Sequence, residues 1–153
     1  LKKEIFVTTI NQAFESVITA CAEPRGYQNE GTWLVDEMIE AYIRLHHQGV
    51  AHSIETWKED RLVGGLYGVC LGGAFFGESM FSRVSNASKV ALVSLASHMA
   101  KHDGDLIDCQ ITTNHLLSMG GVEIPRSRFL SLLEHSVDRT DLSHIWDHHL
   151  EII

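Results

Sequence analysis

The sequence is poor in the residues that mark several specialised classes of protein. Three cysteines in 153 residues, with no CxxC pair, argue against a disulfide framework and are typical of reduced thiols in the cytoplasm. No apolar run approaches the roughly 20 residues that cross a bilayer, and residues 1–17 lack the continuous apolar region of a signal peptide. Only two prolines occur, and no repeat or linker divides the chain. We therefore expect one cytoplasmic domain over residues 1–153, without membrane contact.

Positive charge is also scarce. Lysine and arginine number 12 against 20 aspartates and glutamates, which gives a net charge of −8 with ten histidines neutral. A protein that grips long stretches of nucleic acid is usually basic, because contacts to phosphates supply most of the non-specific affinity. The charge balance argues against that class and leaves room for a local contact, such as one to a single-stranded end.

The first half of the chain combines helical and strand patterns. Residues 9–22 have the pattern of a helix, and a second helix is expected between a cap at Thr32 and a stop at Gly49. The apolar stripe of this second helix comprises Val35, Met38, Ile39 and Tyr42. Three strands follow, with KEDR as the first turn, and they comprise residues 51–59, 61–73 and 74–82.

The second half predicts a crossover connection. A helix that begins at Asn86 or Ser88 and stops at Gly104 leads into a strand over residues 105–112. A strand, a helix and a returning strand favour parallel pairing. A short helix over 114–119 comes next, and a last helix has Pro125 in its first turn. Its inward side chains are expected to be Phe129, Leu132 and Leu133. The fold class is α/β, a mixed sheet covered by helices.

Five glycines crowd the segment from Gly64 to Gly73, in and after the second predicted strand. Glycine normally weakens a strand, so this number calls for a reason. One interpretation is a twisted sheet with bulges. The other is a ligand that lies against the backbone, and both stay open.

A carboxylate interrupts the third predicted strand. Strict alternation places Ala74, Phe76, Glu78 and Met80 on one face. A buried, ionised carboxylate needs a cation, hydrogen bonds or water, because burial without partners is very costly. Glu78 therefore lies at a solvated edge or pairs with Arg61 or Arg83, or it binds an ammonium group beside apolar walls. The last arrangement suits an α-amino acid with an apolar side chain.

The strand over 105–112 shows the same kind of interruption. Alternation places Asp108 and Gln110 on one face, while Ile107, Cys109 and Ile111 form an apolar face. An amide is not a useful base, but its carbonyl can accept a hydrogen bond from an attacking amine, and Asp108 can orient the amide. The alternative is an ordinary solvated strand face.

Other constellations are weaker. Ser79, His115 and Asp108 contain the side chains of a triad, but the G-x-S-x-G elbow is missing. Cys109 is expected in the core. The paired histidines have no HExxH or CxxC companion, so no metal site is expected. A local basic patch is conceivable, although basic residues are more often simply solvated. Its members would be Lys58, Arg61, Arg83, Lys89, Arg126 and Arg128.

Seven words occur in order along the chain: GTWL, AHSIE, LVGGLYGV, FFGESMFSR, NASK, LIDCQ and EIPRSRF. Together they resemble the leucyl/phenylalanyl-tRNA–protein transferase family of bacteria. FGESMFSR followed by NASK and LIDCQ is the most specific part. The resemblance runs from the NQAFESVI segment to EIPRSRF, which is most of the sequence.

The resemblance implies a fold and an activity. The fold is a GNAT-like acyltransferase fold, of class α+β, with a mixed, mostly antiparallel sheet flanked by helices. The activity is transfer of leucine or phenylalanine from the 3′ end of aminoacyl-tRNA to an N-terminal lysine or arginine of an acceptor protein. Such tagging marks the acceptor for degradation by the N-end rule, in the cytoplasm. It requires neither a metal nor another cofactor.

The resemblance also assigns site residues. Glu78 matches a carboxylate near the aminoacyl group, and Asp108 and Gln110 match a pair that orients the attacking amine. Substrate-binding positions matched here are Trp33, Leu66, Phe75, Ser79 and Met80. Leu66 stands where the family often has methionine, a volume-conserving exchange. Contacts to the tRNA would fall to Arg83, Lys89 and Arg126. The smaller N-terminal domain of the family is expected to lie outside these 153 residues.

Two other functions fit parts of the pattern. An acetyl-CoA N-acetyltransferase would need a Gly-rich Q/RxxGxG/A loop between the GESMF strand and the NASK helix, and that loop is missing. A non-catalytic module that binds aminoacyl groups or basic N-termini would use the same residues without turnover.

Overall fold

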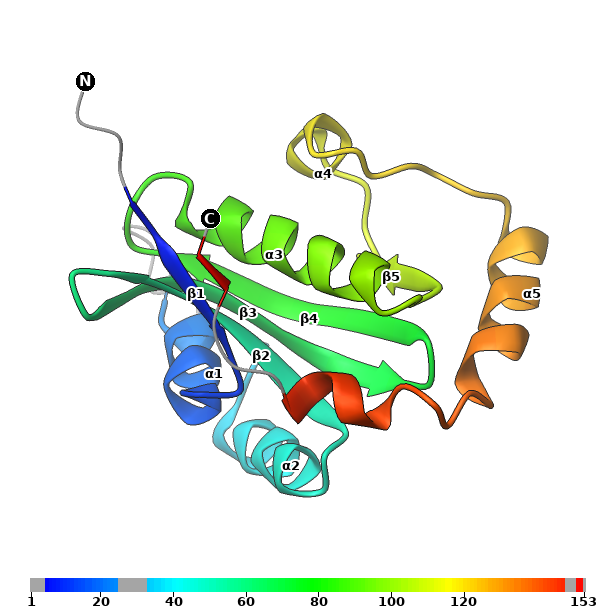
Figure 1. The fold of residues 1–153 in the computed structure, drawn as a ribbon. Helices are drawn as coiled ribbons and strands as arrows, with labels where there is room; N and C mark the ends of the chain where they lie inside the picture. Colours follow the sequence, from blue (N-terminus) through cyan, green and yellow to red (C-terminus); the bar gives the residue numbers. More distant parts are fainter. Residues whose placement is uncertain (1–4, 25–32, 148–150, 153) are drawn as a thin grey trace.

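The computed structural model describes residues 5–24, 33–147 and 151–152, which form a sheet with helices on both faces (Figure 1). The strand order across the sheet is β5-β4-β3-β2-β1-β6. The strands are β1 (Val7–Ile10), β2 (Ala51–Lys58), β3 (Arg61–Leu71), β4 (Ala74–Ser82), β5 (Leu106–Asp108) and β6 (Glu151–Ile152). The helices are α1 (Phe14–Ala22), α2 (Asp36–His47), α3 (Ala87–Lys101), α4 (Asn114–Ser118), α5 (Arg126–Val137) and the 3-10 helix η1 (Ser143–Asp147).

Strands β2, β3 and β4 form an antiparallel meander, as the alternation predicts. The KEDR turn is a two-residue hairpin, because Lys58 pairs with Arg61. Glu59 and Asp60 have φ values of 51° and 60°, the left-handed conformation that this tight connection requires. The expected mixed, mostly antiparallel sheet is therefore confirmed, with β4 and β5 as its parallel pair.

The two faces of the sheet carry separate cores. Helix α3 covers one face, where Leu66 and Phe75 pack with Leu95. Helices α1 and α2 cover the other face, where Tyr67 and Phe81 belong to a second cluster (Figure 1). Burial of large apolar side chains on both faces explains the continuous apolar character of β3, since about 25 cal/mol is gained per Å² removed from water.

The expected first helix, 9–22, is wrong at its start. Val7–Ile10 pair with β2 as strand β1, and the helix begins only at Phe14. The segment is rich in β-branched residues, which favour a strand, and Trp57 opposite Val7 completes the pairing. Thr32, the expected cap of the second helix, lies outside the described residues; α2 begins at Asp36 after Val35 as its N-cap residue.

Strand β4 contains a bulge at Glu78. Gly77 pairs with Gly68 and Ser79 pairs with Tyr67, so Glu78 has no residue opposite it on β3. The extra residue reverses the alternation beyond it. Strict alternation predicts that Glu78 and Met80 share a face, and this prediction is wrong. Met80 packs against the α3 cluster, whereas Glu78 contacts α2.

The strand expected over 105–112 is shorter than its pattern. The ladder with β4 ends where Asp108 meets Phe76, and Gln110 takes a φ of 63°. Beyond this point the chain turns away from the sheet. Asp108 and Gln110 are therefore not neighbours on one strand face, although a hydrogen bond still joins them.

Two of the clustered glycines are required by close packing. A Cβ atom on Gly68 would lie 2.1 Å from the carbonyl oxygen of Phe76. A Cβ atom on Gly72, whose φ is +57°, would lie 1.9 Å from the carbonyl oxygen of Ser136. Protein atoms occupy the space beside these two glycines, which supports the interpretation as a tightly packed, bulged sheet.

The last helix begins where predicted, directly after Pro125, but its burial is weaker than expected. Pro125 is the N-cap residue of α5, and Phe129, Leu132 and Leu133 are each only half-buried. The deep contacts of the C-terminal region come instead from η1, whose Trp146 packs against Phe75 in the α3 cluster.

A neutral histidine supports η1. The buried ring of His52 stacks on Trp146 with 4.3 Å between ring centroids, and Asn11 donates to its Nδ1 at 3.0 Å. Burial above all, with nearby His46 and His98, lowers the pKa of His52 to about 3.

This lowered pKa predicts a pH dependence of stability. The unfolded chain, with an ordinary histidine pKa near 6.5, binds the proton first as the pH falls. The contribution of His52 is therefore complete above pH ~6.5 and is lost progressively toward pH ~3, by about 5 kcal/mol in all. Urea unfolding between pH 7 and 4 should show this slope in the wild type and a flatter one in His52→Phe. The exposed control His135→Gln should keep the slope; an unchanged slope in His52→Phe would contradict the prediction.

Candidate active site

Three of the polar residues expected at the site lie where β4 and β5 separate. Asp108 ends β5, and its Oδ1 accepts a hydrogen bond from the backbone N–H of Gln110 at 2.8 Å. The side-chain Nε2 of Gln110 donates to the carbonyl oxygen of Gly77 at 2.8 Å. This bond bridges the gap between the strands and fixes the amide, one residue before Glu78. Asp108 was expected to orient the side-chain amide of Gln110. In the structure it instead holds the backbone N–H of Gln110.

Glu78 is held from the opposite side by a tyrosine. The hydroxyl group of Tyr42, on α2, donates to Oε2 of Glu78 at 3.0 Å. Burial and this hydrogen bond raise the pKa of Tyr42 to about 12, so the hydroxyl stays a donor. The ring of Tyr67 meets that of Tyr42 edge to face, with centroids 5.2 Å apart, and its buried hydroxyl has no hydrogen-bond partner among the described residues.

The sequence reasoning missed both tyrosines as polar groups. The sequence pattern places Tyr42 only in the apolar stripe of the second predicted helix. Tyr67 lies near several glycines in a strand whose pattern predicts burial. A signal was available in each case, because a buried tyrosine normally seeks a partner for its hydroxyl group. The partner of Tyr42 could not be named from the sequence, because it depends on how α2 packs against β4.

The expected apolar positions occupy different surroundings. Leu66 and Phe75 are core residues beneath α3, and Met80 packs against the same cluster while half-buried. Ser79 pairs with Tyr67 on the opposite face, and Trp33, just before α2, is 52% exposed. The structure therefore joins Leu66, Phe75 and Met80 in one cluster, whereas Ser79 and Trp33 lie outside it.

An open groove of about 990 Å³ begins at Asp108 and Gln110 and extends away from the sheet. Its walls come from α3, the segment after β5, α4 and α5, and most of its side chains are apolar. Cys109 lines it; burial, followed by the charge of Asp108, raises the pKa of this half-buried thiol, which makes it a poor nucleophile. The expectation of Cys109 in the core is thus only partly met. The local sequence pattern does not predict the groove. Its walls come together only because residues 109–126 connect β5 to α5 along an irregular path.

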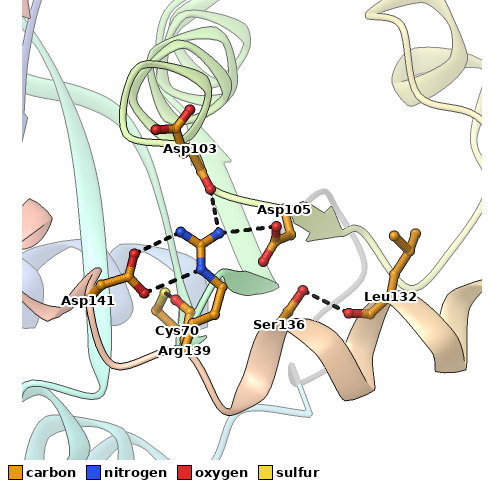
Figure 2. Close-up of polar contacts among 8 residues, drawn as sticks. Cys70, Asp103, Asp105, Leu132, Ser136, Arg139 and Asp141 are labelled. Carbon is orange, nitrogen blue, oxygen red and sulfur yellow. Dashed lines mark hydrogen bonds and ion pairs between the residues drawn. The ribbon is translucent and has the colours of Figure 1, made fainter.

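Arg139 anchors the outer wall of the groove. Figure 2 shows its guanidinium between three groups: it donates to Oδ1 of Asp105 at 3.1 Å, to the carbonyl oxygen of Asp103 at 2.6 Å and to Oδ2 of Asp141 at 2.9 Å. Its hydrogen bond with Asp141 lowers the pKa of that carboxyl group. At the same end of α5, the carbonyl oxygen of Ser136 accepts the N–H of Gly73 at 2.9 Å. Helix α5 is therefore fixed to both the β3–β4 turn and the α3–β5 loop.

The expected tRNA contacts do not form one patch. Arg83 forms an ion pair with Glu23 at 2.7 Å, just after β4. Lys89 is exposed in the first turn of α3, whereas Arg126 begins α5 and lines the groove. No hydrogen bond joins Ser79, His115 and Asp108 within the described residues, so the triad that the sequence argued against is not assembled there.

The structure also bears on metal-binding and membrane proteins. Among residues 5–24, 33–147 and 151–152, no group of three or more histidine, cysteine, aspartate or glutamate side chains is placed to hold a metal ion. In the same part of the chain, every helix is too short or too polar to span a membrane. All three cysteines are free.

A mostly antiparallel sheet, flanked by helices and opening between a bulged strand and its parallel neighbour, defines an α+β protein with an acyltransferase-like fold. A polar cluster lies at the opening. A sequence profile of the leucyl/phenylalanyl-tRNA protein transferase family matches residues 1–134, and the chain belongs to that family.

Curated relatives named leucyl/phenylalanyl-tRNA–protein transferase agree. The protein from Desulforapulum autotrophicum is 52% identical over 146 residues, which cover 95% of this chain and 64% of the relative. That from Chromohalobacter salexigens is 54% identical over 146 residues, 95% of this chain and 57% of the relative. That from Thermodesulfovibrio yellowstonii is 48% identical over 151 residues, 99% of this chain and 62% of the relative. The chain thus spans about three-fifths of the length of these relatives.

Proposed function

We propose that this domain transfers leucine or phenylalanine from aminoacyl-tRNA to the N-terminal lysine or arginine of an acceptor protein. The observation that supports the proposal is the hydrogen bond from the Gln110 amide to the carbonyl oxygen of Gly77, which joins Gln110 to β4 one residue before Glu78, where β5 ends at Asp108. Family membership supplies the reaction class. The cellular role that follows is N-end-rule tagging in the cytoplasm.

The proposed chemistry is aminolysis of an ester. The amine of the acceptor attacks the ester carbonyl carbon, a C–N bond forms, and the C–O bond to the terminal ribose breaks. The proton lost by the amine ends on the released ribose hydroxyl group, so atoms and charge balance. An ester is already activated, and alignment of the amine on it can supply most of the acceleration.

Each residue has a separate proposed role. Glu78 binds the α-ammonium group of the aminoacyl residue, with Tyr42 holding its carboxylate. The Gln110 carbonyl oxygen accepts a hydrogen bond from the attacking amine, because Gly77 already engages its amide N–H. Asp108 maintains the left-handed conformation of Gln110.

The remaining expected positions complete the proposal. The aminoacyl side chain would pack against Met80 at the edge of the cluster that contains Leu66 and Phe75. Trp33 and Ser79 would lie near the aminoacyl ester. The tRNA end would contact Arg83, Lys89 and Arg126, local cations on an otherwise acidic protein.

A transfer assay tests the function. The chain is mixed with labelled Leu-tRNA and a peptide that begins with arginine, and Glu78→Gln is expected to reduce transfer about tenfold to a hundredfold. This is the range for loss of a hydrogen bond to a charged group, about 1.5–3 kcal/mol. Tyr42→Phe should cost less, because the carboxylate remains.

The same assay separates the alternatives. Turnover of acetyl-CoA in place of Leu-tRNA would identify an acetyltransferase and refute the proposal. Binding of an adenosine that carries leucine in amide linkage, without any transfer from Leu-tRNA, would identify a binding module. Equal activity of Glu78→Gln and wild type would remove Glu78 from the site.

A further inference from the structure

The groove beyond Asp108 holds a second carboxylate, that of Glu123. Its Oε1 accepts a hydrogen bond from the hydroxyl group of Thr112 at 2.7 Å, and both residues line the groove. Among the described residues, no cation forms an ion pair with Glu123, although Arg126 and Arg128 line the same groove. The second oxygen of this carboxylate is therefore available to a ligand.

The bond from Thr112 ties Glu123 to the end of β5. Thr112 lies four residues beyond Asp108, a span of at most about 14 Å when fully extended. The actual path is shorter, because Gln110 has a φ of 63° and the N–H of Ile111 bonds back to the carbonyl oxygen of Cys109 at 2.7 Å. Asp108 and Glu123 therefore belong to one bounded site, not to two distant surfaces.

The walls between these carboxylates are apolar. Ile111, Leu117 and Val122 line the groove although they are 69%, 47% and 79% exposed. Large apolar side chains gathered at a concave, exposed place indicate a contact surface. Apolar walls with a carboxylate beyond them complement an aliphatic stem that ends in a cation, which is the form of a lysine or arginine side chain.

We propose that Glu123 is the residue that selects a basic first residue in the acceptor, by pairing with its side-chain cation. The aliphatic stem of that side chain lies along the apolar wall, while its α-amine lies near Gln110. The inference rests on the proposed transfer function for the identity of the acceptor. Arg126 and Arg128 remain outside this contact and suit an anionic group instead.

Equilibrium binding tests the inference without catalysis. The probes are two pentapeptides that differ only in an N-terminal arginine or citrulline, a neutral analogue of nearly the same shape. The wild-type chain should bind the arginine peptide about tenfold more tightly. Glu123→Gln should bind both peptides equally, because glutamine keeps an acceptor for Thr112 but removes the charge. The exposed Glu134 on α5 provides a matched control, and Glu134→Gln should keep the tenfold preference.

Three outcomes overturn the inference. They are no preference for arginine in the wild type, a preference that survives in Glu123→Gln, and an equal loss in Glu134→Gln, which would point to net charge alone. Transfer from Leu-tRNA is measured in parallel. A selective peptide preference without transfer would refute the proposed function and leave Glu123 as the binding residue, whereas transfer without the preference would refute only the role of Glu123. Unchanged thermal midpoints are expected, since Glu123 is exposed.

Discussion

Replacing Asp108 by alanine is expected to lower the rate of leucine transfer about a hundredfold, because Gln110 would lose the acceptor that holds its backbone N–H. A non-glycine residue with a φ of 63° needs such support. Misplacing a catalytic group by about 1 Å can cost a factor of ~100 in rate. Single-turnover transfer from saturating Leu-tRNA measures this loss apart from binding.

The variant Asp108→Asn separates positioning from base catalysis. Asparagine keeps a side-chain oxygen that can accept the Gln110 N–H, so positioning predicts a rate within about threefold of wild type. If Asp108 were a general base, it would accelerate transfer by a factor of about 10²–10⁴. The Asp108→Asn variant would then be as inactive as Asp108→Ala. Equal loss in both variants would contradict the positioning role.

The second large effect is on stability, at the buried carboxylate of Glu55. Its side chain accepts hydrogen bonds from the hydroxyl groups of Thr9 and Ser53 and from the backbone N–H groups of Gln12 and Ala13, which precede α1. Burial raises its pKa despite these donors. Glu55→Ala would leave several donors unsatisfied beside a cavity, and we expect the free energy of unfolding to fall by about 4 kcal/mol.

Urea unfolding at pH 7 measures that change. Glu55→Gln should cost less than alanine, because it retains one acceptor oxygen for the donors around it. Glu15→Ala, an exposed substitution in the first turn of α1, should change stability by about 0.5 kcal/mol or less. A cost for Glu55→Ala no larger than that of Glu15→Ala would show that the buried carboxylate does not support β1 and α1.

The strands that alternation predicts best are those whose two faces are both buried by helices. Strands β2, β3 and β4 and helix α3 match their predicted extents within a few residues. The bulge at Glu78 could not be predicted, because it depends on how β3 and β4 register against each other. It reverses the face of every later residue in β4, so a correct strand assignment still gave the wrong neighbour for Glu78.

The candidate residues follow from the sequence pattern, whereas their arrangement depends on tertiary packing. Polar residues on apolar strands indicate Glu78, Asp108 and Gln110, and the structure joins Gln110 to Asp108 and to Gly77, one residue before Glu78. Tyr42 and the groove were missed, since both depend on tertiary packing that no local period encodes. Glu123 opens the EIPRSRF word, but its irregular segment has no periodicity that distinguishes its side chain from that of a solvated glutamate.

The anchoring of Arg139 has a consequence for how this domain can vary. The chain leaves the sheet after Asp108 and returns at Asp138, and Arg139 then closes the excursion onto Asp103 and Asp105 (Figure 2). Lengthening a closed loop costs little, about 0.6 kcal/mol for each doubling. Insertions near Gly120 and Gly121 would therefore reshape the groove while the sheet and its anchoring stay the same. Loop length alone would then change the proposed acceptor contact, independently of strands β4 and β5.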